Sequence, residues 1–276
     1  MIQGFGTREI TDQILRAFVK SANGVMHEKH KVVGQYEQTE WPTFEKLDTP
    51  VAVWGCLRGT EAVIDEAGQK EQDWYFFDHA YVMNESKHMP NMKLKDRVYR
   101  VTKNAQLIND IDELSYDDYK RIEKYEKHVQ LEPWKKDGKY ILVFEPSDFA
   151  KRWWEVPNWT EDTIQLLKAN TDLEIRIRKK NSLISFESEV KGAKAVVSLQ
   201  SAAAIQAHIW GIPGYCAEMS AAYPVSHSME MIPKGLDSIQ YIPDHHRQRW
   251  LNSILANQYT MTEIADGTCY NRLKDK

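Results

Sequence analysis

The sequence has few cysteines and no long apolar run. Its three cysteines, Cys56, Cys216 and Cys269, are too few and too widely spaced for a disulfide framework or a structural zinc site. No stretch approaches the roughly 20 consecutive apolar residues of a membrane span, and residues 1–7 lack the basic-then-apolar order of a secretory signal. We therefore expect a cytoplasmic protein with three free thiols and no membrane span.

The sequence also lacks an excess of positive charge. It has 36 Lys and Arg against 40 Asp and Glu, a formal net charge of -4, which argues against a uniformly basic surface for nucleic acid. The 42% of hydrophobic residues can fill a globular core, and 276 residues are enough for two domains. Nine tryptophans and thirteen tyrosines are an aromatic surplus of the kind that stacks on sugars or bases.

The N-terminal half shows the pattern of a strand-helix-strand unit with a parallel sheet. Apolar spacing predicts a helix, capped by Thr7, then two apolar strands separated by a second helix. These elements cover residues 8–22, 51–55, 60–67 and 74–79. The polar, glycine-containing segment 135–138 is the best candidate for a domain boundary, so we expect a first domain over residues 1–137.

The C-terminal half, residues 138–276, shows a clearer alternation of strands and helices. Residues 140–144 are all apolar, as in a strand buried on both faces. Further strands are expected at 173–178, 193–198 and 211–216, with helices between them and a closing helix over 244–259. This order predicts a doubly wound parallel sheet, whose ligands bind beyond the carboxyl ends of the strands.

The most specific motif lies where the strand 193–198 meets the next helix. Ser201, Ala202, Ala203 and Ala204 begin that helix with small side chains, which leaves its free N–H groups accessible to a phosphate. The segment runs on to Gly211-Ile212-Pro213. It resembles the donor-side motif of GT-B-fold glycosyltransferases, including the capsule-type family, and the compact aromatic chain is similar to bacteriophage enzymes that glycosylate DNA bases.

The resemblance covers roughly residues 140–225 and implies two Rossmann-like domains with parallel sheets and a cleft between them. It implies a nucleotide-sugar donor, such as a UDP-sugar, and no metal or other cofactor. Gln206 stands where that family commonly has an acidic residue that binds the ribose, although its amide can also bond a hydroxyl. Adjacent His245 and His246 point apart on a helix and lack a third ligand, so we expect no metal site.

Donor-binding candidates are the polar or small residues at the predicted carboxyl edge of the second sheet. They are Ser147, Arg178, Lys180, Gln200, Ser201, Ala202, Gln206, Glu218 and Ser220. Among them, Arg178 and Lys180 end a strand and would neutralise the leaving diphosphate without a metal.

Acceptor-side candidates follow two strands of the first domain. Asp78 and His79 end the strand 74–79, where either group can take the proton of an attacking hydroxyl. Arg58 and Gly59 follow the preceding strand and admit a substrate close to the backbone, and Tyr81 lies just beyond His79. We predict Asp78 as the first choice for the catalytic base.

The sequence therefore predicts a glycosyltransferase that moves a sugar from a nucleotide sugar to an acceptor hydroxyl. The acceptor is a hydroxymethylated base of phage DNA or, alternatively, a polysaccharide. A nucleotide-sugar epimerase and a non-catalytic nucleotide-binding module share the same architecture and remain open. No obligate protein partner is evident from the sequence.

Overall fold

The computed structural model describes residues 1–28, 49–83, 96–236 and 239–276, which fold into two compact units. Unit 1 comprises Met1–Gln106 and Asn257–Lys276, and unit 2 comprises Leu107–Ala256. The predicted boundary at 135–138 lies inside unit 2. The backbone N–H groups of Glu132 and Lys135 donate to the carbonyls of Ile209 and Gly211, at 2.8 Å each, which fastens this polar segment to unit 2.

Unit 1 is built on a sheet of six strands within the described residues, in the order β11-β5-β4-β3-β1-β2. Its elements are β1 (Gln3–Gly6), α1 (Glu9–Ser21), β2 (Val25–Glu28), β3 (Val51–Trp54), α2 (Thr60–Gln69), β4 (Trp74–His79), β5 (Val98–Lys103), β11 (Gln258–Thr260), α11 (Met261–Ala265) and α12 (Thr268–Leu273). Strands β3 and β4 are parallel, as predicted, and β1 and β2, which were not predicted, extend the parallel part of the sheet, whereas β5 runs antiparallel to both β4 and β11.

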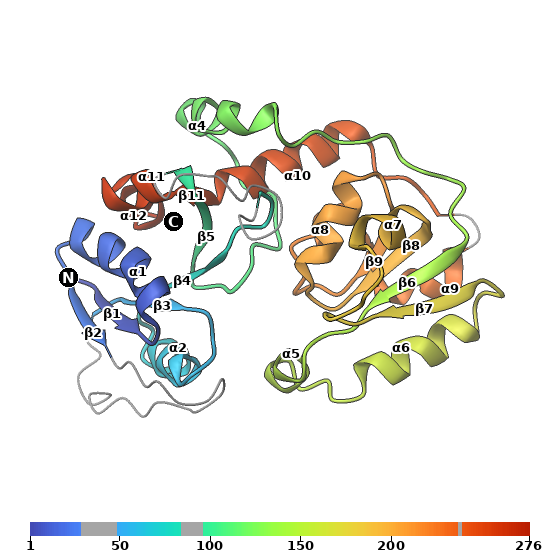
Figure 1. The fold of residues 1–276 in the computed structure, drawn as a ribbon, viewed down its shortest axis with the longest axis horizontal. Coiled ribbons are helices and arrows are strands. Elements are labelled where there is room, and N and C mark those ends of the chain that lie inside the picture. Colours follow the sequence, from blue (N-terminus) through green and yellow to red (C-terminus); the bar gives the residue numbers. More distant parts are fainter. Residues whose placement is uncertain (29–48, 84–95, 237–238) are drawn as a thin grey trace. The chain divides into compact units, whose positions relative to one another are not determined.

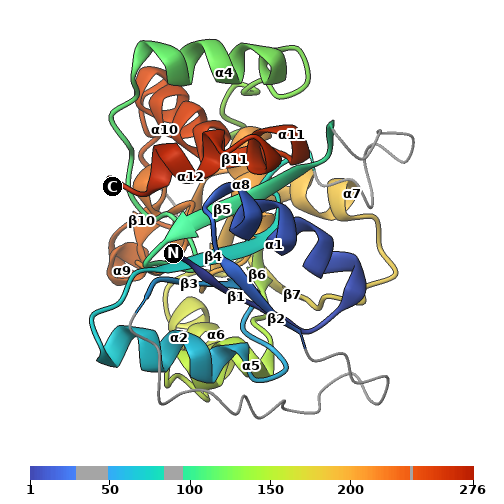
Figure 2. The same ribbon diagram turned by 90° about the vertical axis from the view of Figure 1, so that its left-hand side faces the viewer.

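The two faces of this sheet are covered by different helices (Figures 1 and 2). Helix α1 buries Ile14, Leu15 and Phe18 in a cluster that also includes residues of α11 and α12. Helix α2, with Val63 and Ile64 buried, lies on the opposite face from α1. The C-terminal segment therefore completes the core of unit 1.

One predicted element of this segment was wrong. The closing helix was expected to reach residue 259, but it ends at Ala256 and Tyr259 lies in β11, opposite Tyr99 of β5. The side chain of Tyr259 is fully buried, because strand pairing places it in the core of unit 1.

Unit 2 contains a sheet of five strands within the described residues, in the order β10-β9-β8-β6-β7, all parallel. Its elements are α4 (Tyr116–Glu126), β6 (Tyr140–Phe144), α5 (Asp148–Trp153), α6 (Trp159–Lys168), β7 (Glu174–Arg178), α7 (Phe186–Lys191), β8 (Ala193–Ser198), α8 (Ala202–Ile209), β9 (Gly214–Cys216), η3 (Tyr223–Val225), β10 (His227–Ser228), η4 (Met229–Met231), α9 (Ile232–Gly235) and α10 (Asp244–Ala256). This order confirms the predicted doubly wound α/β fold.

The core of unit 2 lies on both faces of its sheet. Ile141, Val143 and Val197 pack with Leu167 of α6 and Ile232 of α9 on one face. Figure 1 shows α7 and α8 on the face opposite α6. The apolar run 140–144 is buried at every position, as a central parallel strand requires.

Candidate functional site

Each sheet has a point where the strand order reverses. In unit 1, β1 lies between β2 and β3, the next two strands in the sequence. In unit 2, β6 lies in the same way between β7 and β8. Ligands of open α/β sheets bind outside the carboxyl ends of the strands at such a point. The turns that follow β1, β3, β6 and β8 therefore lie at the edges where ligands of such sheets bind.

The turn after β8 in unit 2 is ordered by two serines. The Oγ of Ser198 accepts a hydrogen bond from the backbone N–H of Ser201 at 3.0 Å, and the Oγ of Ser201 caps α8 by accepting from Ala203 N–H at 3.2 Å. Ala202 is exposed and carries no bulky side chain. The first turn of α8 thus has a helix dipole, small side chains and a fixed backbone, which suits a phosphate group.

Two further candidates, Ser147 and Gln200, lie at the same edge. Ser147 is exposed and caps α5, with its Oγ accepting from Ala150 N–H at 3.2 Å. The side-chain carbonyl of Gln200 accepts from Nε1 of Trp154 at 2.6 Å. This bond holds the turn after β8 to the end of α5, so Gln200 has a positioning part in the turn. Gln206 lies half-buried in the middle of α8.

The loop after β9 differs from its predicted role at one residue. Ala217 N–H donates to the carbonyl of Ser198 at 3.0 Å, so the loop begins beside the Ser201 turn. Glu218 is exposed, as a ligand contact requires, but Ser220 is fully buried and its Oγ accepts from Ala222 N–H at 3.3 Å. The hydroxyl of Ser220 therefore shapes the loop and has no solvent-facing surface.

The two cations predicted at the end of β7 differ in exposure. Arg178 forms an ion pair with Glu189, whose side chain is only 5% exposed, and its guanidinium lies 5.2 Å from the Phe186 ring centroid. Arg178 is thus part of the packing between β7 and α7. Lys180 is exposed, as is Lys179, whose Nζ lies 3.8 Å from a carboxylate oxygen of Glu145.

Glu145 was missed by the sequence reasoning. It directly follows β6, and Lys151 of α5 approaches its carboxylate at 3.9 Å. A carboxylate after a buried apolar strand, followed by lysines near the next strand end, was the available signal. Two lysines thus share the single carboxylate of Glu145, and Lys180 follows one of them in the chain.

In unit 1, the end of β4 places Asp78 in a defined geometry. Arg100 of β5 donates from Nη2 to Oδ2 of Asp78 at 2.5 Å, and the N–H of His79 donates to Oδ1 at 2.7 Å. The Asp78 side chain remains 31% exposed. Both oxygens are oriented, and each keeps a lone pair for a proton or an incoming hydroxyl.

The surroundings of Asp78 are aromatic. The guanidinium of Arg100 lies 5.2 Å from the ring centroid of Tyr81. This cation–π contact with a buried ring helps to hold the Arg100 side chain in position. The exposed ring of His79 packs edge-on against Trp54 at 5.6 Å between centroids. Burial, together with the negative charge of Asp78, raises the pKa of the Cys56 thiol to about 12, so this thiol is not a nucleophile at neutral pH.

The turn after β3 contains Arg58 and Gly59 in left-handed conformations, with φ of 64° and 88°. A non-glycine residue in this region is strained, and it keeps this conformation only where neighbouring contacts hold the backbone. Thr60 makes such contacts, because its buried Oγ1 donates to the carbonyls of Gly55 and Leu57 at 2.9 and 2.8 Å. The backbone of this turn is therefore held in one shape beside β4.

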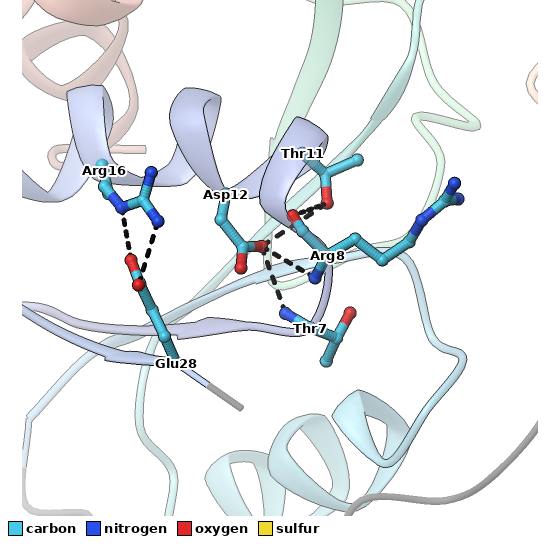
Figure 3. Close-up of polar contacts among 6 residues, drawn as sticks. All are labelled: Thr7, Arg8, Thr11, Asp12, Arg16 and Glu28. Carbon is cyan, nitrogen blue, oxygen red and sulfur yellow. Dashed lines mark hydrogen bonds and ion pairs between the residues drawn. The ribbon is translucent and has the colours of Figure 1, made fainter. Parts of the chain in front are cut away.

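The turn after β1 is closed by Asp12 (Figure 3). The Oδ1 of this fully buried carboxylate accepts from the N–H groups of Thr7 and Arg8 at 3.1 and 3.3 Å. A Cβ on Gly6 would lie 2.4 Å from the Asp12 carboxylate, so a glycine is required there. The expected cap by Thr7 was wrong, since Arg8 occupies the N-cap and Asp12 satisfies the free amides.

Within the described residues, no group of three or more His, Cys, Asp or Glu side chains is arranged to hold a metal ion. None of the helices within the same residues is both long enough and apolar enough to cross a bilayer.

The fold is similar to that of solved structures. KpsC of Thermosulfurimonas dismutans, described as a β-Kdo 2,7-transferase, matches 98% of this chain and 99% of its own, with 13% sequence identity and a TM-score of 0.54. The β-Kdo 2,4-transferase of the same KpsC matches 93% and 89%, with 10% identity and a TM-score of 0.45. No protein-family model matches the chain, and no curated protein matches its sequence. The first likeness confirms the expected architecture of two Rossmann-like α/β units with parallel strands.

Proposed function

We propose that this chain is a glycosyltransferase that moves a sugar from a nucleotide-sugar donor to a hydroxyl group of a glycan. The likeness to a Kdo transferase over nearly the whole of both chains carries the proposal. A shared fold does not fix a function by itself, so the side chains at the strand ends have to supply the required chemistry. In this proposal, side chains of unit 2 bind the donor and a side chain of unit 1 activates the acceptor.

Unit 2 supplies the groups for the donor. The first turn of α8, with Ser201 and Ala202, offers backbone N–H groups to the donor phosphate. Lys180 is the exposed cation that neutralises the phosphate as the nucleotide leaves. The amide of Gln206 and the carboxylate of Glu218 are candidates for hydroxyl groups of the donor.

Unit 1 supplies the group that acts on the acceptor. The carboxylate of Asp78 takes the proton of the acceptor hydroxyl as its oxygen bonds to the anomeric carbon and the sugar–phosphate bond breaks. The hydrogen bond from Arg100 holds this carboxylate in place. His79, exposed beside it, is the alternative base.

A glycan fits the acceptor role better than DNA. The chain has a net charge of -4, whereas a DNA-binding surface neutralises several phosphates with lysine and arginine. A hydroxymethylated DNA base is therefore the second acceptor to test. Trp54 is the partly exposed aromatic side chain near Asp78, and its ring suits the apolar face of a sugar as well as it suits a base.

The test begins with thermal shifts in the presence of nucleoside mono- and diphosphates, followed by transfer assays with the corresponding nucleotide sugars. Mass gain would be measured on oligosaccharides, on hydroxymethylated DNA and on unmodified DNA, with Asp78→Asn as the inactive control. Mass gain on an oligosaccharide supports the proposal, and gain on hydroxymethylated DNA alone moves the acceptor to DNA. A converted nucleotide sugar without an acceptor indicates an epimerase, and the absence of any nucleotide-induced shift contradicts the donor site.

A further inference from the structure

Unit 2 contains a pocket of about 380 Å³ that the donor and acceptor assignments leave unexplained. Three segments line it: the stretch 109–111 ahead of α4, Tyr223 and Pro224 of η3, and His246 and Arg249 on one face of α10. None of the residues assigned above to the donor is among them. All lining residues belong to unit 2, so the pocket is complete within that unit.

The walls of this pocket are hydrogen-bonded to one another. The amide of Asn109 donates to the carbonyl of Glu218 at 3.0 Å, which ties the stretch 109–111 to the loop that leads into η3. Nε2 of His246 lies 3.0 Å from the carbonyl of Pro224, which ties α10 to η3. The N–H of Asp112 donates to Oγ of Ser253 at 3.0 Å and ties the first segment to α10.

A fourth bond anchors the centre of this arrangement. The fully buried Trp250 donates from Nε1 to the carbonyl of Ala221 at 2.7 Å, two residues before η3. The three lining segments are thus held by hydrogen bonds that their own residues or close chain neighbours make. A ligand that enters would not have to order these segments, and this saving favours binding.

The lining combines apolar surface with planar polar groups. Tyr223, Pro224 and Ile111 supply the apolar part, and Tyr223 is partly exposed. Asn109, Asp110 and Arg249 are exposed and carry planar groups that donate to or accept from hydroxyls in pairs. The volume lies at the lower end of the roughly 300–1,000 Å³ range of small-ligand pockets.

We propose that this pocket is a saccharide-binding subsite that holds one part of the acceptor glycan while another part is glycosylated. Tyr223 covers the apolar face of a sugar ring, and Asn109, Asp110 and Arg249 bond its hydroxyl groups. The saccharide class follows from the lining alone. The assignment of the bound saccharide as the acceptor rests on the proposed function.

A nucleotide is the competing occupant, and the lining fits it less well. Phosphate groups require several donors or positive charges, whereas the guanidinium of Arg249 shares the pocket with the carboxylate of Asp110. The pocket also lies on the side of α10 rather than on the first turn of α8. Hydroxyl groups, by contrast, are served equally by carboxylate, amide and guanidinium.

The experiment measures saccharide binding without any donor. The intact protein would be applied to an array of neutral, uronic-acid-containing and phosphorylated oligosaccharides, and the strongest binder would then be titrated by NMR. We expect saturable binding that falls at least tenfold in Tyr223→Ala and several-fold in Arg249→Gln. Tyr119→Ala, an exposed tyrosine on α4, and Gln248→Ala, an exposed neighbour on α10, are matched controls that retain binding.

Each outcome bears on the proposal. Absence of binding to every saccharide, or binding that Tyr223→Ala leaves unchanged, overturns it. A nucleoside monophosphate that binds the wild type but not Tyr223→Ala reassigns the pocket to the nucleotide and also overturns it. Because no sugar transfer is measured, failure here is distinct from failure of the proposed function, which the mass-gain assay reports.

Discussion

The parallel strands of unit 1 and unit 2 have the same spatial order, but the backbone amides of the turns near the switch points have different hydrogen-bond partners. After β1, the amides of Thr7 and Arg8 are taken by the buried carboxylate of Asp12, an anion that belongs to the chain itself. After β8, the serine caps leave the small residue Ala202 exposed at the start of α8. The turn after β1 in unit 1 is therefore closed by a carboxylate of the chain itself, whereas the first turn of α8 in unit 2 contains no acidic residue and is the one that we propose for the donor phosphate.

This difference fits the separate tasks that we propose for the two units. The amides of the turn after β1 already bind a carboxylate and have little left for a donor phosphate, so the proposed contribution of unit 1 is Asp78 at the end of β4. Unit 2 has charged side chains at its strand ends, and the first turn of α8 contains no acidic residue.

The largest expected effect is on sugar transfer by Asp78→Asn. An amide keeps the shape of the side chain but cannot take a proton, so kcat should fall by a factor of about 10²–10⁴. Nucleotide binding by unit 2 should change less than about twofold, because the task of unit 2 is untouched. Steady-state kinetics and a binding titration measure the two quantities, and equal losses in both would contradict the division of tasks.

The second effect is an acid sensitivity that resides in unit 2. His208 is fully buried, and its Nδ1 donates to the carbonyl of Ala204 at 2.7 Å, which leaves Nε2 unprotonated. Burial, with a smaller contribution from Arg247, lowers the pKa of His208 from 6.5 to about 4. Between these values the unfolded chain binds a proton that the native state excludes. The free energy of unfolding is therefore unaffected by His208 above pH 6.5 and falls as the pH is lowered towards 4.

The loss over this interval is about 3 kcal/mol. Urea unfolding at a series of pH values checks it. His208→Gln should flatten the dependence in this interval, whereas His245→Gln, an exposed histidine on α10, should keep it. An identical slope in the wild type and His208→Gln would show that His208 does not cause the acid sensitivity.

The third effect concerns the closed turn of unit 1. Asp12→Ala leaves two amides without their acceptor in a buried position and should destabilise the protein by about 2 kcal/mol. Asp65→Ala, which removes an exposed carboxylate from α2, should cost less than about 0.5 kcal/mol. Urea midpoints compare the two, and equal values would mean that Asp12 does not hold the turn.

The smallest effect is on donor affinity through Lys180. Lys180→Gln should raise the Kd of the bound nucleotide about threefold to tenfold, since one exposed charge near a phosphate is worth roughly 1 kcal/mol. Lys168→Gln, at the end of α6 and the opposite edge of the sheet, is the control. Calorimetric titration distinguishes them, and equal affinity in both variants would remove Lys180 from the donor site.

The sequence predicted unit 2 well because its strands are continuous apolar runs and its helices have regular spacing. The run 140–144 and the serine that begins α8 are local signals, and both lie where they were expected. By contrast, the partners of Arg178, Ser220 and Asp12 are set by tertiary packing. Glu189, eleven residues from Arg178, decides that this cation is internal, and no periodic pattern reveals such a choice.

The boundary between the units was the least accessible feature. A polar segment containing glycine resembles a linker in any sequence, yet 132–135 is fastened to unit 2 by backbone bonds. The return of 257–276 to unit 1 depends on the pairing of β11 with β5, a contact between distant segments. Local composition carries no information on either arrangement.

The most direct test of this division of tasks is hydrogen exchange with the nucleotide that gives the largest thermal shift. We predict slower exchange for the backbone amides of residues 201–204 at the start of α8, and unchanged exchange for residues 7–12 after β1. Protection of residues 7–12 without protection of 201–204 would contradict the account, because it would place the donor phosphate in the turn that Asp12 closes.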